Sequence, residues 1–531
     1  MRLKIHRTIY IVLLLLLVGS MTTSNFMMNL AWVLLFANWL VEWDMKRKFA
    51  GFSRNGFLHV AILYFILHLV AMLWTDNFAY GIDDIRQKLR LIAIPLVILT
   101  SAPLSKRQWR MVAFVYIVTI FVVTIIGVVR YLTIPDIPYR QIVPFISHIR
   151  FSLNVCMAMC ILIAAITHCG EHILHSVVML LLCLWFLAFL LLIQSYTGLV
   201  ILLISCVIML VIGWKHIPNK PVRWVSVSFL AVVLLVVGGI SIYYVNEYYT
   251  PRTSSVGANR LTANGNPYTH RRDGLVECGR YVNDYVCESE LRSQWPRVSS
   301  CPLDSITPTG YPVYPALVRY LNAAGLTKDS AGVSHLSPTD IAAIEQGIAN
   351  PVYLQQASLR RMYYVMLFEY ENYRAYGSVI GFTMLQRIEL WENAYALFRE
   401  NLICGVGPGD VRDALDARLC NVGSPLAGSH RLPHNQYLTL LLSFGLVGFL
   451  LLLAALIWAL VRTRSLRHTL FATFFTIATL SFLTEDTLET MAGAVFIAFF
   501  LSLLSARTGP HVGPRPPQPE FLPDQPSDHQ N

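Results

Sequence analysis

Charge is scarce in this sequence. Asp, Glu, Lys and Arg make up 14% of its 531 residues, whereas soluble domains carry roughly 25%. Hydrophobic residues reach 55%, and the mean hydropathy is +0.53. This composition excludes an ordinary soluble domain, and apolar runs of about 17 residues or more indicate helices that cross a membrane.

We expect an all-α, polytopic integral membrane protein with about 12 transmembrane helices and one large, helical extracytoplasmic loop. The predicted spans are 8–23, 26–43, 57–74, 88–104, 109–130, 151–168, 173–193, 197–214, 223–245, 436–461, 468–484 and 490–506. The predicted regions are transmembrane helices in 1–245, a helical lid in 246–435, further transmembrane helices in 436–506, and a disordered, Pro-rich cytoplasmic tail in 507–531.

Basic residues concentrate in alternate connections between the predicted spans. "MKRKFAGFSR", "SKRQWR", "WKHIPNKPVR" and "RTRSLRH" are rich in Lys and Arg, whereas "TDNFAYGIDD", "QSYTG" and "TEDTLE" are acidic or uncharged. By the positive-inside rule, the basic connections and both chain ends face the cytoplasm. The long segment 246–435 therefore faces outward.

The formal net charge of +10 does not indicate nucleic-acid binding. Within 246–435, 17 Lys and Arg are balanced by 18 Asp and Glu, and no basic stripe with interleaved aromatic residues occurs. The lipid bilayer, and no nucleic acid, is the expected partner. No CxxC pair marks a metal site. An oxidising compartment permits disulfides among the outward cysteines, but no pairing follows from Cys278, Cys287, Cys301, Cys404 and Cys420.

No Asp, Glu, Lys or Arg is expected near the centre of a predicted span. Ion-coupled transporters normally hold such groups at the membrane midplane and often repeat one half of the fold in the other. The insertion 246–435 interrupts any twofold repeat, and we interpret His68 and His175 inside their spans as packed side chains. A transporter or flippase is therefore the less favoured alternative.

Polar residues gather instead at the outward ends of the predicted helices. Taken singly, an arginine there snorkels to headgroups, a histidine anchors the interface and an acidic turn is solvated. Topology nevertheless brings several such groups to one membrane surface, which predicts a site. The candidates are His148 and Arg150 before one span, Arg387 with Trp391 one helical turn later, His434 and Asn435 at the start of another span, and Glu485 and Asp486 in "TEDTLET".

Two motifs carry a family resemblance. "RIELWENAYALFRENLICGVGPGDV" is followed about twenty residues later by "PHNQYLTLLLSFGLVGFLLLL". An Arg-x-x-x-Trp helix, a Gly-Val-Gly-x-Gly turn and a His-Asn-x-Tyr-Leu helix start resemble the O-antigen ligase and O-antigen polymerase family, as does the acidic turn "EDTLET". The resemblance is specific in its motifs over 385–450 and 481–495 and extends over most of the chain by architecture.

The resemblance implies a metal-independent, inverting glycosyltransferase that needs no cofactor. Its expected partners are a polyprenyl-diphosphate-linked glycan donor, with undecaprenyl diphosphate as carrier, and a glycan or lipid-anchored acceptor. The expected location is the bacterial inner membrane, with the site facing the periplasm. Ligase with a lipid A-core acceptor, polysaccharide polymerase and protein O-oligosaccharyltransferase remain open. The first two are favoured because nothing resembles a dedicated protein-acceptor site.

The chemistry of this reaction assigns roles to the candidates. A diphosphate leaving group calls for cations, and the planar guanidinium suits it better than an ammonium. The acceptor hydroxyl loses a proton as it attacks, and an imidazole with an ordinary pKa of about 6.5 suits a general base. The predicted catalytic residues are His434 and Arg387. The predicted substrate-binding residues are Arg150, Asn435, Trp391, His148, Glu485 and Asp486.

One position departs from the family pattern. Many relatives read Ser-Arg-Thr-Gly after the seventh span, where the arginine helps to bind the diphosphate, but "QSYTG" has Tyr196 there. Either Arg150 or another arginine of the outward loop supplies the second cation, or the diphosphate is bound differently. A further alternative is a divalent cation held by Glu485, Asp486 and Glu489.

Overall fold

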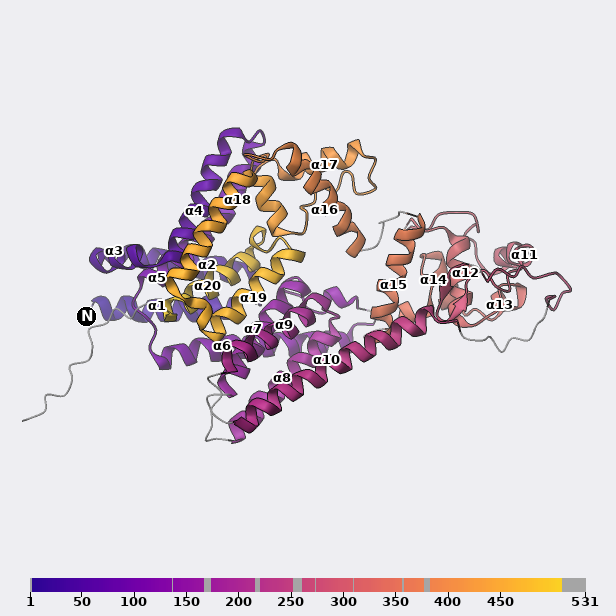
Figure 1. The fold of residues 1–531 in the computed structure, drawn as a ribbon, viewed down its shortest axis with the longest axis horizontal. Coiled ribbons are helices and arrows are strands. Elements are labelled where there is room, and N and C mark those ends of the chain that lie inside the picture. The colour runs from indigo at the N-terminus through magenta and orange to yellow at the C-terminus, as the bar shows by residue number, and fades with distance from the viewer. Residues whose placement is uncertain are drawn as a thin grey trace, which may run out of the picture.

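The structure is a computed structural model that describes residues 2–135, 137–166, 173–214, 220–251, 260–272, 274–308, 310–355, 358–376 and 383–508. Within these ranges the fold is almost entirely α-helical (Figure 1). The only strands in this part of the chain are the short antiparallel pair β1 (Val276–Glu277) and β2 (Arg280–Tyr281). The predicted tail lies outside the described residues from 509 onward.

The helices fall into three groups along the chain. Those before the outward insertion are α1 (Arg2–Ser20), α2 (Asn25–Val41), α3 (Met45–Arg54), α4 (Gly56–Ala71), α5 (Phe78–Thr100), α6 (Lys106–Thr133), α7 (His148–Ile166), α8 (Ile173–Leu192), α9 (Tyr196–Gly213) and α10 (Lys220–Tyr249). The insertion contains α11 (Glu288–Val298), α12 (Val313–Ala324), α13 (Ser330–Ser334), α14 (Pro338–Glu345), α15 (Leu359–Tyr376), α16 (Thr383–Glu400) and α17 (Val411–Asn421). The last group is α18 (Gln436–Thr463), α19 (Thr469–Thr484) and α20 (Met491–Thr508), and short 3-10 turns include η2 (Tyr139–Gln141) and η6 (Thr487–Glu489).

Within the described residues, eight helices are long and apolar enough to cross a membrane. The count reaches nine if α2 and α3, which meet at a bend of 117°, form one broken span. The helices α19 and α20 are apolar but shorter. The predicted all-α, polytopic membrane architecture is confirmed, whereas the predicted count of about twelve spans is not.

Helix α5 differs from the span predicted at 88–104. It begins at Phe78, so Lys88 and Arg90 lie near its middle rather than at its start, and both are buried. The predicted start of this helix at residue 88 is therefore wrong. Lys88 can lie inside the helix because Asp84, one turn earlier on α5, and Glu489, distant in sequence, compensate its charge.

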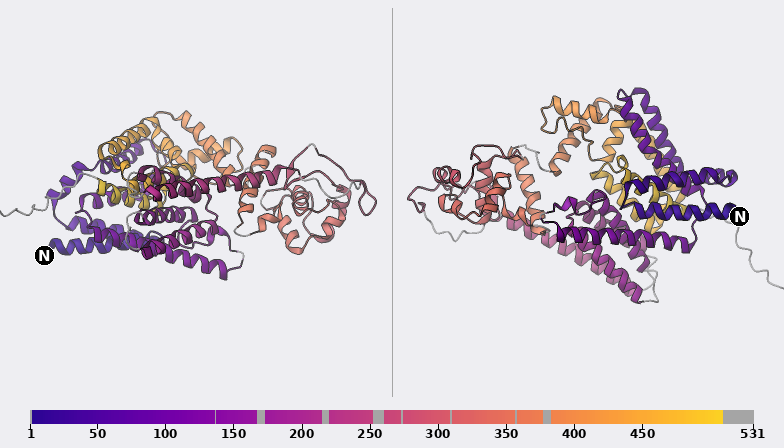
Figure 2. Two further views of the ribbon diagram at one scale, coloured as in Figure 1. Left: turned by 60° about the horizontal axis from the view of Figure 1, so that its bottom comes forward. Right: turned by 180° about the vertical axis from the view of Figure 1, so that it is seen from behind.

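The core of the bundle joins helices from both ends of the chain. Helix α20 packs along α5, α19 along α9, and α18 along α4 (Figures 1 and 2). Helix α7 is the most enclosed of the candidate spans, with continuous burial from Phe151 to Leu162. A helix that is apolar on every side belongs in such a central position. The first turn of α7, which carries His148 and Arg150, leads directly into this buried stretch.

Residues 260–355 form a small unit of their own beyond the end of α10 (Figure 1). Trp295, Leu317 and Ile344 are fully buried in its core. Helix α14 begins with Ser337 as N-cap in a capping box with Asp340. The N-terminus of the chain lies at the opposite end of the long axis of the molecule (Figure 1).

The glycine-rich turn after α16 docks against a break in α18. Gly445 has a φ of +63°, which interrupts the helix. The N–H of Val406 donates to the Leu442 carbonyl at 2.7 Å, and the N–H of Leu446 donates to the Leu402 carbonyl at 2.8 Å. Backbone groups freed inside a membrane helix need such internal partners. "GVGPGD" therefore connects α16 to α18 as a structural turn.

Candidate functional site

One carboxylate, Glu485, brings the two predicted phosphate-binding arginines together. Arg387 Nη2 on α16 donates to Glu485 Oε1 at 2.5 Å, and Arg150 Nη2 on α7 lies 3.6 Å from Glu485 Oε2. The side chain of Arg387 is 15% exposed, that of Arg150 is 20% exposed, and that of Glu485 is 6% exposed. Because one carboxylate faces two guanidiniums, the cluster keeps a positive charge. The predicted convergence of these residues is therefore observed.

The environment of Glu485 reflects burial more than pairing. Burial raises the pKa of its carboxyl above the ordinary value, and the neighbouring Arg387 and Arg150 oppose that rise. The Glu485 carboxylate is held by a charge-assisted hydrogen bond from Arg387 and by an ion pair with Arg150. It consequently holds both guanidiniums at one place in the bundle.

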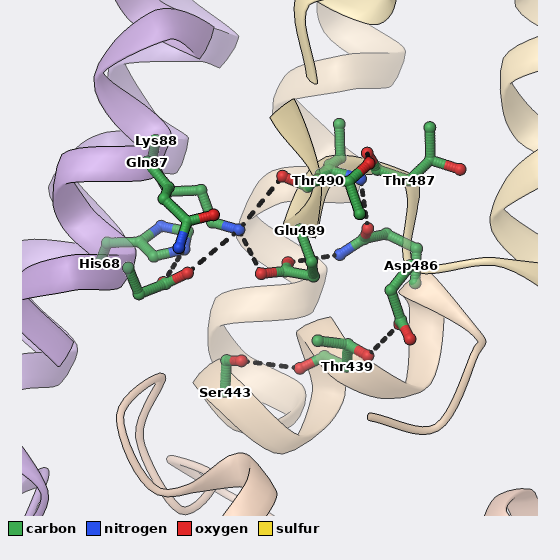
Figure 3. Close-up of polar contacts among 12 residues, drawn as sticks. His68, Gln87, Lys88, Thr439, Ser443, Asp486, Thr487, Glu489 and Thr490 are labelled. Carbon is green, nitrogen blue, oxygen red and sulfur yellow. Dashed lines mark hydrogen bonds and ion pairs between the residues drawn. The ribbon is translucent and has the colours of Figure 1, made fainter. Parts of the chain in front are cut away.

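Asp486 holds the segment that carries His434. Its Oδ2 accepts the backbone N–H of His434 at 2.7 Å. Its Oδ1 accepts the Thr439 hydroxyl at 2.6 Å (Figure 3). Burial raises the pKa of Asp486 to about 7. His434 has a φ of +53°, a left-handed conformation that non-glycine residues adopt only when their surroundings hold it. Asp486 therefore positions His434 through the main chain.

Asn435 lies at the start of a helix, as the sequence predicts. Its side-chain Oδ1 accepts the N–H groups of Tyr437 and Leu438 at 3.0 and 3.2 Å. This is the bonding of a helix N-cap. The asparagine therefore begins α18.

The imidazole of His434 is neutral in the site as it stands. Burial lowers its pKa to about 4, and the charges of Arg387, Arg431 and Arg150 lower it further in that order. Protonation would add a fourth positive charge to a poorly solvated cluster. The ring consequently presents a lone pair at neutral pH, which is the form that accepts a proton.

The two remaining candidates flank the arginines. His148 opens α7, and its ring stands edge-on to Tyr139 with centroids 5.6 Å apart. It interacts electrostatically with Arg150 and Arg387. Trp391 follows Arg387 by one turn on α16, and its indole N–H is buried with no hydrogen-bond partner among the described residues. His148 therefore borders the cluster, and the Trp391 indole offers a donor to an acceptor group.

A buried charge network beside the cluster was not predicted from the sequence (Figure 3). The Lys88 ammonium contacts the Glu489 carboxylate and lies 3.3 Å from Asp84. His68 Nε2 lies 3.5 Å from Asp84, and the Gln436 amide donates to Glu489 at 3.0 Å. The network links α4 and α5 to η6 and the start of α18. The sequence signals were the spacing of Asp84 and Lys88 and the acidic turn, but nothing in the sequence joins them.

The three carboxylates of the acidic turn have separate partners. Glu485 faces the arginines, Asp486 accepts from His434 and Thr439, and Glu489 accepts from Lys88 and Gln436. No group of three or more His, Cys, Asp or Glu side chains in the described part of the chain converges as a metal-binding set. This placement of the oxygens does not favour a shared cation site.

The fold and the site together define a multi-pass, all-α membrane protein with an arginine, carboxylate and histidine cluster at one end of its bundle. Residues 380–453 match the sequence model of the family described as O-Antigen ligase. The matched segment includes Arg387, Trp391, His434 and Asn435, so the family resemblance is confirmed there. No curated protein matches the chain. The match supports a membrane enzyme of the O-antigen ligase or polymerase type.

Proposed function

We propose that this protein is a glycosyltransferase of the O-antigen ligase type. It transfers a glycan from undecaprenyl diphosphate to a hydroxyl of lipid A-core at the periplasmic face of the inner membrane, without a metal ion. The observation that carries the proposal is the placement of Arg150 and Arg387 on one carboxylate, Glu485, with the neutral ring of His434 held nearby. The family match over 380–453 supports the same class of enzyme.

The arginines serve the leaving group in this proposal. A diphosphate bears negative charge as it departs and needs no proton, so fixed cations stabilise it in the transition state. Each guanidinium offers parallel N–H donors that fit two phosphate oxygens. Because Glu485 compensates only one of the two charges, the pair retains attraction for an anion. Glu485 also holds the guanidiniums in place before the donor arrives.

The reaction is a single displacement at the anomeric carbon. The acceptor oxygen bonds to that carbon as the bond to the phosphate oxygen breaks, and the diphosphate leaves with the electron pair. The proton of the acceptor hydroxyl passes to the imidazole of His434. Attack from the side opposite the leaving group inverts the configuration. A polymerase or a protein O-oligosaccharyltransferase would differ only in the acceptor that supplies the hydroxyl.

Purified full-length protein given an undecaprenyl-diphosphate glycan tests this function. Lipid A-core, a second polyprenyl-linked glycan and a Ser/Thr peptide would be offered as acceptors, and we expect transfer to lipid A-core. His434→Ala is expected to lower the rate about 10²- to 10⁴-fold because the proton acceptor is lost. The matched control is His335→Ala, which removes an exposed histidine at the C-terminus of α13.

Two results would contradict the proposal. Full transfer by folded His434→Ala and Arg387→Ala proteins would show that the assigned site is wrong. Transfer that stops with a chelator and returns with a divalent cation would favour the metal-dependent alternative at Glu485, Asp486 and Glu489. Transfer to the second glycan or to the peptide would keep the donor chemistry and replace the proposed acceptor.

A further inference from the structure

Helix α15 lays Arg361 against the turn between α8 and α9. Arg361 Nη1 donates to the Gln194 side-chain oxygen at 3.2 Å. Gln194 has a φ of +49°, and Ser195 caps α9 at the next position. Tyr196, the first residue of α9, lies within electrostatic range of Arg361. A cation from the outward insertion is thus placed on a turn of the membrane bundle.

Tyr139 connects Arg361 to the arginine and Glu485 cluster. The Arg361 guanidinium lies 6.0 Å from the centroid of the Tyr139 ring, and the His148 ring meets the same tyrosine at 5.6 Å. His148 and Arg150 share the first turn of α7. One aromatic ring therefore separates Arg361 from the helix end that carries Arg150, although α7 and α15 are about 200 residues apart.

The charge of Arg361 is not compensated by a carboxylate. Within the described residues no Asp or Glu lies at ion-pair distance, its side-chain partner is the neutral amide of Gln194, and its Nε is buried without a hydrogen bond. The neighbouring Arg360 differs, because it pairs with Glu247 at 3.1 Å and lies over the Tyr364 ring. A half-buried cation without a counter-charge favours the binding of an anion.

We propose that Arg361 is a third phosphate-binding arginine of the donor site. The inference rests on the proposed function, and its ligand is the diphosphate of a polyprenyl carrier. Arg150 and Arg387 hold the phosphate next to the sugar, and Arg361 holds the phosphate next to the isoprenoid. Tyr139 and His148 lie between Arg361 and the first turn of α7, which carries Arg150, so the two cations suit two linked phosphates of one ligand. Of the alternatives that Tyr196 leaves open, this assigns the missing cation to the outward insertion.

The test is binding of undecaprenyl diphosphate to the full-length protein in phosphatidylcholine nanodiscs. Arg361→Ala is expected to weaken binding about 10- to 100-fold, the value of a charge-assisted hydrogen bond. Arg361→Lys should lose less, because it keeps the charge without the planar fork. Binding of undecaprenyl monophosphate should change little, since the second phosphate is missing. Arg360→Ala, on the same helix, should stay within about twofold.

A second variant tests the position and not only the residue. Tyr196→Arg in the Arg361→Ala protein should restore diphosphate binding, because position 196 lies within electrostatic range of the guanidinium that was removed. The thermal midpoint and the size-exclusion profile of each variant report whether it is folded. Arg361→Lys keeps the test valid if the alanine variant is unstable.

Several outcomes would overturn the inference. Wild-type affinity in Arg361→Ala, or equal losses in Arg361→Ala and Arg360→Ala, would show that α15 only supports the fold. A changed response to added phosphatidylglycerol in place of diphosphate binding would identify Arg361 as a headgroup anchor. Arg150→Ala and Arg387→Ala are measured in parallel. If they weaken binding and Arg361→Ala does not, only this inference fails; if none has an effect, the proposed function fails with it.

Discussion

His434 is surrounded by the groups that a diphosphate would neutralise. Its pKa is lowered by burial and then by Arg387, Arg431 and Arg150, and two of these arginines are the proposed phosphate ligands. An anion bound to them would cancel part of the positive field at the ring. The imidazole should then become a stronger base. The arrangement couples donor binding to activation of the acceptor.

This coupling predicts different pH profiles for kcat/KM and kcat. The profile of kcat/KM reports the free enzyme. It should stay level as the pH falls and decline only at a pH of about 4, where His434 becomes protonated. The profile of kcat reports the bound state, where the pKa of the ring is raised, so its acid limb should lie at higher pH. Initial rates of glycan transfer across pH 4–8 measure both.

Arg431→Gln supplies a control for that profile. It removes one of the charges that lower the His434 pKa without removing a proposed phosphate ligand, so the acid limb of kcat/KM should move to higher pH. Acid limbs at the same pH for kcat and kcat/KM would contradict the coupling. So would a kcat limb at the lower pH.

At the scale of elements, the break in α18 decides how the site is assembled. The first part of α18 follows His434, and the turn that docks at the break follows α16, which carries Arg387. Gly445 allows the helix to break and the turn to approach closely. Its φ is +63°, and a Cβ at this position would lie 2.1 Å from the Ile403 carbonyl oxygen. Side chains tolerate neither that conformation nor that contact.

Gly445→Ala is therefore expected to destabilise the folded protein by more than about 2 kcal/mol and to lower glycan transfer. Thermal unfolding in detergent and the transfer assay measure the two effects. Gly239→Ala on α10 is the matched control, because no atom lies within 4 Å of a Cβ at that position. A Gly445→Ala protein with wild-type stability and activity would show that the break does not hold the site together.

At the scale of the whole molecule, the buried network joins the two ends of the chain. Lys88 on α5 is 1% exposed and contacts Glu489 in η6 and Asp84 on its own helix. Glu489 in turn accepts from Gln436 at the start of α18. Removing one partner of a buried ion pair leaves the other charge uncompensated, which is more damaging than removing both.

Lys88→Met is accordingly expected to destabilise the protein by about 3–5 kcal/mol, and Lys88→Met with Glu489→Gln to recover part of that loss. Unfolding of the purified variants in detergent measures the difference. Arg86→Met, which removes an ion pair whose side chains are 74% and 64% exposed, should have little effect. A double variant less stable than Lys88→Met would contradict the account.

Much of the site was predictable because topology restricts where helix ends lie. Charge asymmetry between connections placed His148, Arg150, Arg387, His434 and Glu485 at one surface, and the motif around Arg387 and His434 is confirmed by the family match. The network of Lys88 was not predictable, since a lysine beside a predicted span is interpreted as interfacial unless its buried carboxylate partners are known. The position of Arg361 was not predictable either, because its neighbours Gln194 and Tyr139 are distant in sequence.

The sequence by itself determined that the chain is helical and membrane-embedded, because hydrocarbon requires long apolar segments with internally satisfied backbones. It also determined which chemical groups were available at the outward helix ends. Only the tertiary structure decided their partners: Glu485 faces two arginines, and Asp486 holds the main chain of His434. The physical reason is that local patterns fix helices, whereas pairing of buried charges depends on how helices distant in sequence pack.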